Sequence, residues 1–466
     1  MVKKTKQSYK RKAPPGFLYV QSASGFDEYQ LKSNGLRVLL REDHSVPITN
    51  VMVTYHVGSR NEATGYTGAT HLLEHLMFKG SKRFNKKNGR EIWSMLETKG
   101  ARVNATTWYD RTNYFAVVPS TCVEDTIAIE ADRMRGAFIR EKDRVAEMTV
   151  VRNEYERGEN NPLEVLNKQI WAAAFVAHPY HHETIGWRSD IEQVPIERLK
   201  AFYNTFYWPN NATILIVGDI ETSRALSLIK KYFGPVPASP RMIPDVYTTE
   251  PLQEGERRVT VRRAGETRIV GIGYKTPPGL HSDTYALEVL AQILADGKTS
   301  RLWSLVDGGR ATEVAPWYFP MRDPGLFILY AFLTPGTAHA DIERVIQEEI
   351  ERVRRRGVTR EEVEKAKARV LADSAYRQDG FEKLADAVNE SIAIGDWRFY
   401  LNFTERIRAV SLEDVMRVAV MYFTEDQRTV GWFVPKLQSR RSRQKGKKES
   451  TTTTEHINEP VTKSKA

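Results

Sequence analysis

The chain has 466 residues, more than one hydrophobic core usually organises, so at least two domains are expected. The formal net charge is +10, but residues 1–14 carry six basic residues and no acid, and residues 437–466 carry eight basic residues against three acidic ones. The two ends therefore hold +11 and the remainder about −1, which argues against a nucleic-acid-binding body.

Residues 1–24 are predicted to form a disordered basic tail, and residues 437–466 a second one. Pro14-Pro15-Gly16 stands where a secretory signal would need an apolar segment, and the lysine-rich start differs from an Arg/Ser-rich transit peptide. Cys122 is the single cysteine, so no intrachain disulfide can form. Without any apolar run of 18 residues, we expect no membrane span and a cytoplasmic location.

The first structured segments are predicted at residues 36–40 and 51–57, which alternate as half-buried strands do. Farther along, Ile92, Met95 and Leu96 mark a helix that Gly100 ends, and residues 103–118 return to extended chain. Strands and helices without a regular βαβ order predict α+β domains, each a mainly antiparallel sheet packed with helices.

Residues 71–75 read His-Leu-Leu-Glu-His, inside an apolar stretch. On a helix His71 and His75 share one face and can direct both imidazoles at one metal ion, while Glu74 can reach a water on that metal. This residue order is that of the inverzincin peptidases. The alternative is a pair of core histidines, but burying these groups among leucines costs several kcal/mol unless they are paired or bind a metal.

A catalytic zinc ion takes three protein ligands and keeps one position open, so a third ligand must come from elsewhere. The predicted helix around residues 147–157 offers Glu147 and Glu154, which lie seven residues apart on one face. Glutamates on helices are usually solvated, and spacing alone does not choose between these two.

The His71–His75 motif followed by Val150-Val151-Arg152-Asn153-Glu154 resembles the pitrilysin/insulinase family of zinc peptidases, and most of all its half-size members, such as the β-subunit of the mitochondrial processing peptidase and bacterial relatives. The resemblance covers roughly residues 30–435. It implies Zn²⁺ held by His71, His75 and Glu154, with Glu74 as general base and Glu147 as a supporting glutamate. It also implies that a strand through Asn104 and Ala105 pairs with extended substrate; a turn-capping role for Asn104 is the alternative.

The chain repeats itself at an offset of 216 residues. Residues 194–217 and 410–433 share a helix, an aromatic pair and a β-rich run, so two like domains are predicted, at residues 25–235 and 257–436, joined by a proline-rich linker at 236–256. The positions that correspond to His71 and His75 are Leu287 and Ala291, so the second domain has no metal ligands. By resemblance, the two domains form half of a clamshell chamber.

Active family members usually carry an Arg and a Tyr seven residues apart, which grip substrate and the developing oxyanion. Here Thr312 stands in place of that Tyr and Leu305 in place of the Arg, and Arg310 and Tyr318 fit only with a shift of register. An oxyanion donor typically contributes ~10²–10³ in rate, so the pair is expected from a homologous partner chain that lacks zinc.

The sequence thus predicts a zinc-dependent endopeptidase that cleaves short or unfolded polypeptides, as the zinc-bearing subunit of a heterodimer. A homodimer is the alternative assembly. The alternative function is a non-catalytic structural or interaction subunit of a processing complex. His178, His181 and His182 are interpreted as parts of a structural loop rather than a second metal site.

Overall fold

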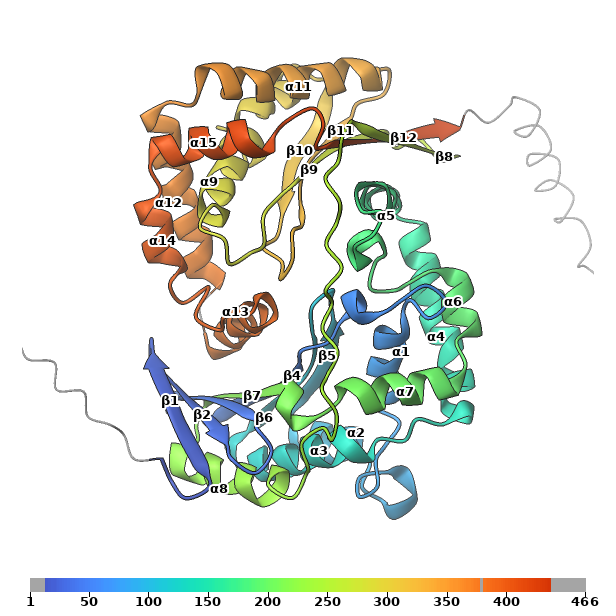
Figure 1. The fold of residues 1–466 in the computed structure, drawn as a ribbon, viewed down its shortest axis with the longest axis vertical. Helices are drawn as coiled ribbons and strands as arrows, with labels where there is room; N and C mark the ends of the chain where they lie inside the picture. Colours follow the sequence, from blue (N-terminus) through green and yellow to red (C-terminus); the bar gives the residue numbers. More distant parts are fainter. Residues whose placement is uncertain (1–12, 378–379, 437–466) are drawn as a thin grey trace, which may run out of the picture.

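The computed structural model describes residues 13–377 and 380–436, which fold into two sheets, each packed with helices (Figure 1). The first sheet has seven strands: β1 (Phe17–Ala23), β2 (Phe26–Leu31), β3 (Arg37–Glu42), β4 (Ile48–Tyr55), β5 (Arg102–Thr107), β6 (Thr112–Pro119) and β7 (Ala212–Gly218). Their order across the sheet is β1-β2-β3-β7-β4-β6-β5, and only β3 and β7 run parallel.

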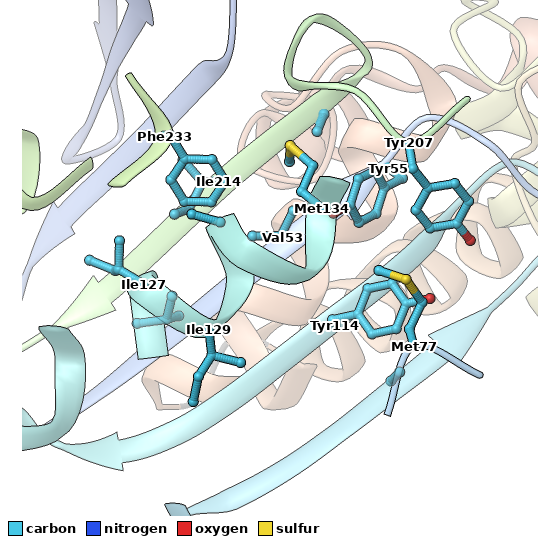
Figure 2. Packing of buried hydrophobic residues seen from close by; sticks show 14 of the residues in the cluster. Val53, Tyr55, Met77, Tyr114, Ile127, Ile129, Met134, Tyr207, Ile214 and Phe233 are labelled. Carbon is cyan, nitrogen blue, oxygen red and sulfur yellow. The ribbon is translucent and has the colours of Figure 1, made fainter. Parts of the chain in front are cut away.

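The helices of this N-terminal domain are α1 (Ala69–Leu76), α2 (Ile92–Leu96), α3 (Val123–Gly136), α4 (Glu141–Glu159), α5 (Pro162–Ala174), α6 (Arg188–Gln193), α7 (Ile196–Phe206) and α8 (Thr222–Phe233). One face of the sheet forms the larger core with them. Figure 2 shows residues of α3, among them Ile127 and Met134, against Val53 and Tyr55 of β4 and Ile214 of β7. Residues 234–256 contain no helix or strand and lead to the second domain.

The second sheet has five strands: β8 (Arg257–Ala264), β9 (Ile269–Lys275), β10 (Ala311–Tyr318), β11 (Leu326–Leu333) and β12 (Arg428–Lys436). Its helices are α9 (Thr284–Ala295), α10 (Ser304–Asp307), α11 (His339–Arg356), α12 (Arg360–Arg377), α13 (Phe381–Ile394), α14 (Phe403–Ala409) and α15 (Leu412–Tyr422). The strand order is β10-β11-β9-β12-β8, with β12 and β8 parallel and the other pairs antiparallel.

The topology confirms the predicted repeat and the α+β class. The series β3-β7-β4-β6-β5 and β8-β12-β9-β11-β10 have the same pairing directions throughout, so the first sheet is the second one extended by β1 and β2. Adding 216 to the first and last residue of α7 gives the first and last residue of α15. Adding 216 to the bounds of α1 gives a segment that lies within α9.

Each domain contributes one helix that packs on the sheet of the other domain. α5, from the N-terminal half, packs on β8, β9 and β12 of the second sheet, as Figure 1 shows. α13, from the C-terminal half, packs on β4 and β7 of the first sheet. Two smaller cores result: one around Ile170 of α5, and one around Val388 of α13. Both helices bury apolar side chains against the sheet of the opposite domain, and these contacts hold the two domains together.

The predicted tail at residues 1–24 is wrong in its second part. Residues 17–23 form β1, which pairs antiparallel with β2. Phe17 is buried in the main core and Tyr19 packs against it, so this segment has the apolar anchors that the lysine-rich start lacks. Residues 1–12 and the predicted tail at 437–466 lie outside the described residues.

Candidate metal centre

Helix α1 presents His71, Glu74 and His75 because its other face is fixed in the core. Leu72, Leu73 and Leu76 are fully buried. The helix starts after Gly68, which has a φ of +84°, and a Cβ at this position would stand 2.4 Å from the Ile185 carbonyl oxygen, so only glycine fits. The buried Glu62 carboxylate accepts hydrogen bonds from the backbone N–H groups of Gly68 and Thr70, both at 2.7 Å, at the positive end of the helix.

Three ligand atoms converge beside α1. The Nε2 atoms of His71 and His75 are 3.3 Å apart, and Glu154 Oε2 on α4 lies 3.6 Å from the first and 3.5 Å from the second. A tetrahedral zinc ion with bonds of about 2.0–2.1 Å holds its ligand atoms about 3.3–3.4 Å apart. Glu154 Oε2 is itself buried without a hydrogen-bond partner among the described residues, as expected of an atom that faces a metal. The donor set and spacing therefore fit zinc.

Glu147 lies behind His75 rather than at the ligand cluster. Its Oε1 is 3.0 Å from His75 Nδ1, and its Oε2 is paired with Lys79. Burial raises the pKa of Glu147, but the hydrogen bonds from Lys79 and His75 outweigh it and leave this pKa lowered. An ionised carboxylate that accepts from Nδ1–H fixes the tautomer in which Nε2 is free to bind a metal.

The protonation states of the motif suit a hydrolytic site. Burial, and to a smaller degree the nearby His75, lowers the pKa of His71 to about 3, so the imidazole is neutral and its lone pair is available. Burial raises the pKa of Glu74, against the hydrogen bond that Thr107 Oγ1 donates to Glu74 Oε2. Glu74 is not one of the three ligands, which leaves it available as a base.

β5 carries the predicted substrate-binding residues at the edge of the sheet. Asn104 is exposed and Ala105 is buried, and the Ala105 N–H donates to Asn104 Oδ1 at 2.9 Å. β5 pairs only with β6, so its other edge is open to an added strand. An added strand would have to replace the Asn104 side chain at the Ala105 amide.

Two residues at this site were not identified from the sequence. Thr107 follows Asn104 on β5 by three residues and reaches Glu74, and Lys79 follows His75 by four residues and reaches Glu147. Neither had a signal in the sequence: Lys79 lies beyond the end of α1 and pairs with a residue of another helix, and a strand gives no indication of which helix faces Thr107.

The other histidines have structural partners. His182 Nε2 lies 3.1 Å from Glu62 Oε2, His178 Nε2 lies 3.2 Å from Asp323 Oδ2, and His181 Nδ1 lies 3.0 Å from the His178 carbonyl oxygen. Within residues 13–377 and 380–436, His71, His75 and Glu154 form the one cluster with metal-ligand spacing.

The second domain carries apolar residues where the first has ligands. Leu287 and Ala291 on α9 and Val370 on α12 stand 216 residues after His71, His75 and Glu154, and all three are buried. Leu305 is buried as well, and Tyr318 packs against Phe327 in the core of the same domain, so neither side chain is placed to grip substrate.

Two family models match most of the chain. Residues 37–187 match the model of the insulinase family (peptidase family M16), and residues 193–370 match the model described as the peptidase M16 inactive domain. The chain is 30% identical over 429 residues to the zinc protease PqqE of Helicobacter pylori, covering 90% of this chain and 95% of that protein. It is 27% identical over 399 residues to an uncharacterized zinc protease of Streptomyces coelicolor, covering 83% and 84% of the two chains.

Solved structures share the fold. The crystal structure of a protease from Helicobacter pylori superposes with a TM-score of 0.82 at 29% identity, over 88% of this chain and 99% of that one. Pitrilysin shares the fold at a TM-score of 0.75 and 16% identity, and the match covers 90% of this chain but 47% of pitrilysin. No helix in the described residues is both long and apolar enough to cross a membrane. With matches to both M16 family models, and a relative 30% identical over nearly its whole length, the chain belongs to the insulinase (M16) family of peptidases as a half-size member.

Proposed function

We propose that this protein is a zinc-dependent endopeptidase that cleaves short or unfolded polypeptides. The observation that carries the proposal is the spacing of 3.3–3.6 Å among His71 Nε2, His75 Nε2 and Glu154 Oε2, with Glu74 adjacent and outside the ligand set. The names of the relatives, which are zinc proteases, support the same chemistry.

His71, His75 and Glu154 would hold the ion, and the bound zinc would supply Lewis acidity that lowers the pKa of a water and polarises the scissile carbonyl. Glu74 removes a proton from the attacking water and passes it to the leaving amine. Its raised pKa favours the first step, because a carboxylate with a higher pKa is a stronger base. Thr107 holds the Glu74 carboxylate in position through Oε2.

Substrate is proposed to add as a strand to the free edge of β5, so that its backbone meets the Ala105 amide. The gripping Arg/Tyr pair is proposed to come from a homologous partner chain without zinc, since Leu305 and Thr312 stand in its place here. A homodimer remains the alternative assembly.

Glu74→Gln tests the catalytic role. We expect hydrolysis of an internally quenched peptide to fall by at least ~10³-fold, while zinc content measured by atomic emission stays near one ion per chain, because the substituted amide keeps an acceptor for Thr107 but cannot take a proton. Glu97→Gln, at an exposed glutamate, is the matched control and should leave both quantities unchanged.

The same assay with and without a co-encoded homologous partner tests the assembly. Slow cleavage by this chain alone and faster cleavage with the partner would agree with a heterodimer. Full family-like rates from this chain alone would overturn the partner requirement. An absence of cleavage in every combination would overturn the peptidase proposal and favour a structural subunit.

A further inference from the structure

A cavity of about 650 Å³ lies between the two domains, lined by α9, α12, β10 and α13 of the second domain and by the turn between β5 and β6 of the first. The cavity lies along α9, α12 and β10, which are the counterparts of α1, α4 and β5 in the repeat. Of the three residues that stand 216 positions after the candidate ligands, Val370 lines this cavity, whereas Leu287 and Ala291 are buried and are not part of its wall. α13 closes it on another side.

Aromatic side chains form much of the cavity wall. Trp317 and Phe319 stand with ring centroids 5.7 Å apart in an edge-to-face arrangement, and Tyr400 and Phe403 lie 5.6 Å apart. Trp108, from the turn between β5 and β6, belongs to the same wall. Phe319 is 49% exposed although it is a large apolar residue, which is unusual for a wall that has no occupant to cover.

The cavity also has an excess of negative charge. Glu390 is neutralised by Arg111, whose Nε lies 2.9 Å from Glu390 Oε1, and Lys383 Nζ donates to the Tyr376 carbonyl oxygen at 3.1 Å. Asp373 and Asp386 also line the cavity, and neither forms an ion pair with the side chains that the structure describes, which do not include that of Arg377. Burial, followed by repulsion from Glu390, raises the pKa of Asp386, and Arg111 and Arg102 offset only part of that rise, so a cation in the cavity would further stabilise its charged form.

We infer that this cavity binds an organic cation: an ammonium group on an apolar body that pairs with Asp386 and Asp373 and lies against Trp317. Aromatic faces attract cations as well as apolar groups, and carboxylates in a partly enclosed site strengthen that attraction. The ammonium could belong to a free arylalkylamine or to a lysine side chain of a polypeptide. The cavity wall includes Trp108, which directly follows Thr107 of the candidate metal centre, and binding of the cation itself needs no hydrolysis.

The test uses the full chain and dansylcadaverine, a primary amine whose dansyl fluorescence rises in apolar surroundings. We expect saturable binding at least about tenfold tighter than that of dansylamide, which has the same ring system without the amine, because one ion pair in such a site is worth about a factor of ten. Equal affinity for the two probes would overturn the inference.

Variants locate the site. The double variant Asp373→Asn/Asp386→Asn should weaken dansylcadaverine binding at least about tenfold and leave dansylamide unchanged, and Trp317→Ala should weaken both probes. Asp341→Asn, at an exposed aspartate of α11, is the matched control. Asp386→Lys gives a second check, since its own ammonium should occupy the site and abolish amine binding. Wild-type affinity in the double variant would overturn the assignment.

Competition identifies the source of the cation. A hexapeptide with one lysine is compared with the same peptide carrying norleucine, both N-acetylated. Displacement by the lysine peptide alone assigns the site to basic side chains of polypeptides, and displacement by free phenylbutylamine alone assigns it to small amines. The Glu74→Gln variant keeps the peptides intact, so loss of binding is distinguishable from failure of the proposed peptidase activity.

Discussion

At the residue scale, one helix face supplies two glutamates with different partners. Glu147 and Glu154 are separated by two turns of α4, so both point toward α1. Glu154 meets the Nε2 atoms of the two histidines, and Glu147 meets Nδ1 on the far side of the His75 ring. The proposed metal ligand and the glutamate that would orient His75 therefore come from one helix, and Lys79 pairs with the second of them.

Lys79→Met should weaken zinc binding about 10–100-fold, because Glu147 would lose its cation and hold His75 less firmly. The dissociation constant is measured by competition with a chromogenic chelator. Lys142→Met, at an exposed lysine on the first turn of α4, is the control and should keep the wild-type affinity. An unchanged affinity in Lys79→Met would contradict the positioning role.

Glu183 makes stability depend on pH. Burial raises the pKa of Glu183 to about 7, although Asn167 Nδ2 donates to its Oε1 at 3.1 Å. Below the unfolded value of 4.5 both states are protonated and the group costs nothing; as pH rises from 4.5 to 7, only the unfolded state releases its proton, and stability is lost.

Glu183→Gln removes that titration and keeps an acceptor for Asn167. The variant should be more stable than the wild type at pH 8, by up to ~3 kcal/mol, and the advantage should shrink toward zero as pH falls to 4.5. Thermal unfolding of the metal-free proteins at both pH values measures it. A larger advantage at low pH would contradict the assigned direction.

At the element scale, two glycines in the second sheet leave room for a helix from the other domain to pack closely on it. Gly271 on β9 and Gly431 on β12 are directly opposite each other, and Ile170 of α5 lies over both. A Cβ at Gly431 would stand 2.6 Å from Ile170 Cγ1, whereas at Gly273 the nearest atom of Ile170 would be at an ordinary 3.5 Å. The missing side chains let α5 sit close to the sheet.

Gly431→Ala should lower the stability by about 1–3 kcal/mol through overpacking, and Gly273→Ala, its matched control, should change it little. Both variants replace a glycine of the same sheet with alanine. They differ in the distance between the new Cβ and Ile170 of α5. In Gly431→Ala/Ile170→Ala the clash is gone, so the combined cost measured by denaturation should be smaller than the sum of the single costs. Simple additivity would show that the contact is not the cause.

At the scale of the whole molecule, the exchange of α5 and α13 makes the two domains dependent on each other. α13 covers apolar residues of the first sheet, including Leu39, Met52 and Leu215, and Thr54 Oγ1 on β4 donates to Asn389 Oδ1 on α13 at 2.7 Å. Trp397 Nε1 also donates to Glu28 Oε2 on β2, at 2.8 Å. Without α13, this face of the first sheet would be in water.

Separate expression of residues 1–256 and 257–466 should therefore give two fragments that bind a hydrophobic dye and unfold without a sharp transition. Co-expression should restore a compact complex with zinc bound near one ion per N-terminal fragment, because each fragment supplies the helix that the other lacks. Size-exclusion chromatography and metal analysis measure this. A well-folded, monomeric N-terminal fragment would contradict the dependence.

Much of this architecture could be predicted from local pattern. The strand predicted at residues 51–57 overlaps most of β4, and the offset of 216 residues is reproduced by the two sheets. The predicted half-burial was wrong, because residues 49–55 are all buried and α13 packs on β4. The prediction failed at residues 17–23, where a short apolar segment next to many lysines became β1 by pairing with β2. Composition describes the average of a whole segment, in which the lysines dominate. A strand can form from a few buried apolar side chains, here Phe17 and Tyr19, and a neighbouring strand to pair with.

The sequence by itself determined which side chains share a face, and so it determined His71, Glu74 and His75 as one constellation, because helical geometry is local. It left Glu147 and Glu154 unresolved without the family resemblance. The tertiary structure placed Glu154 beside the two Nε2 atoms and Glu147 beside His75 Nδ1, brought Thr107 to Glu74, and packed α5 and α13 on the opposite domains. Those outcomes depend on which elements pack together, and packing is set by the fit of whole surfaces rather than by the spacing of residues along one segment.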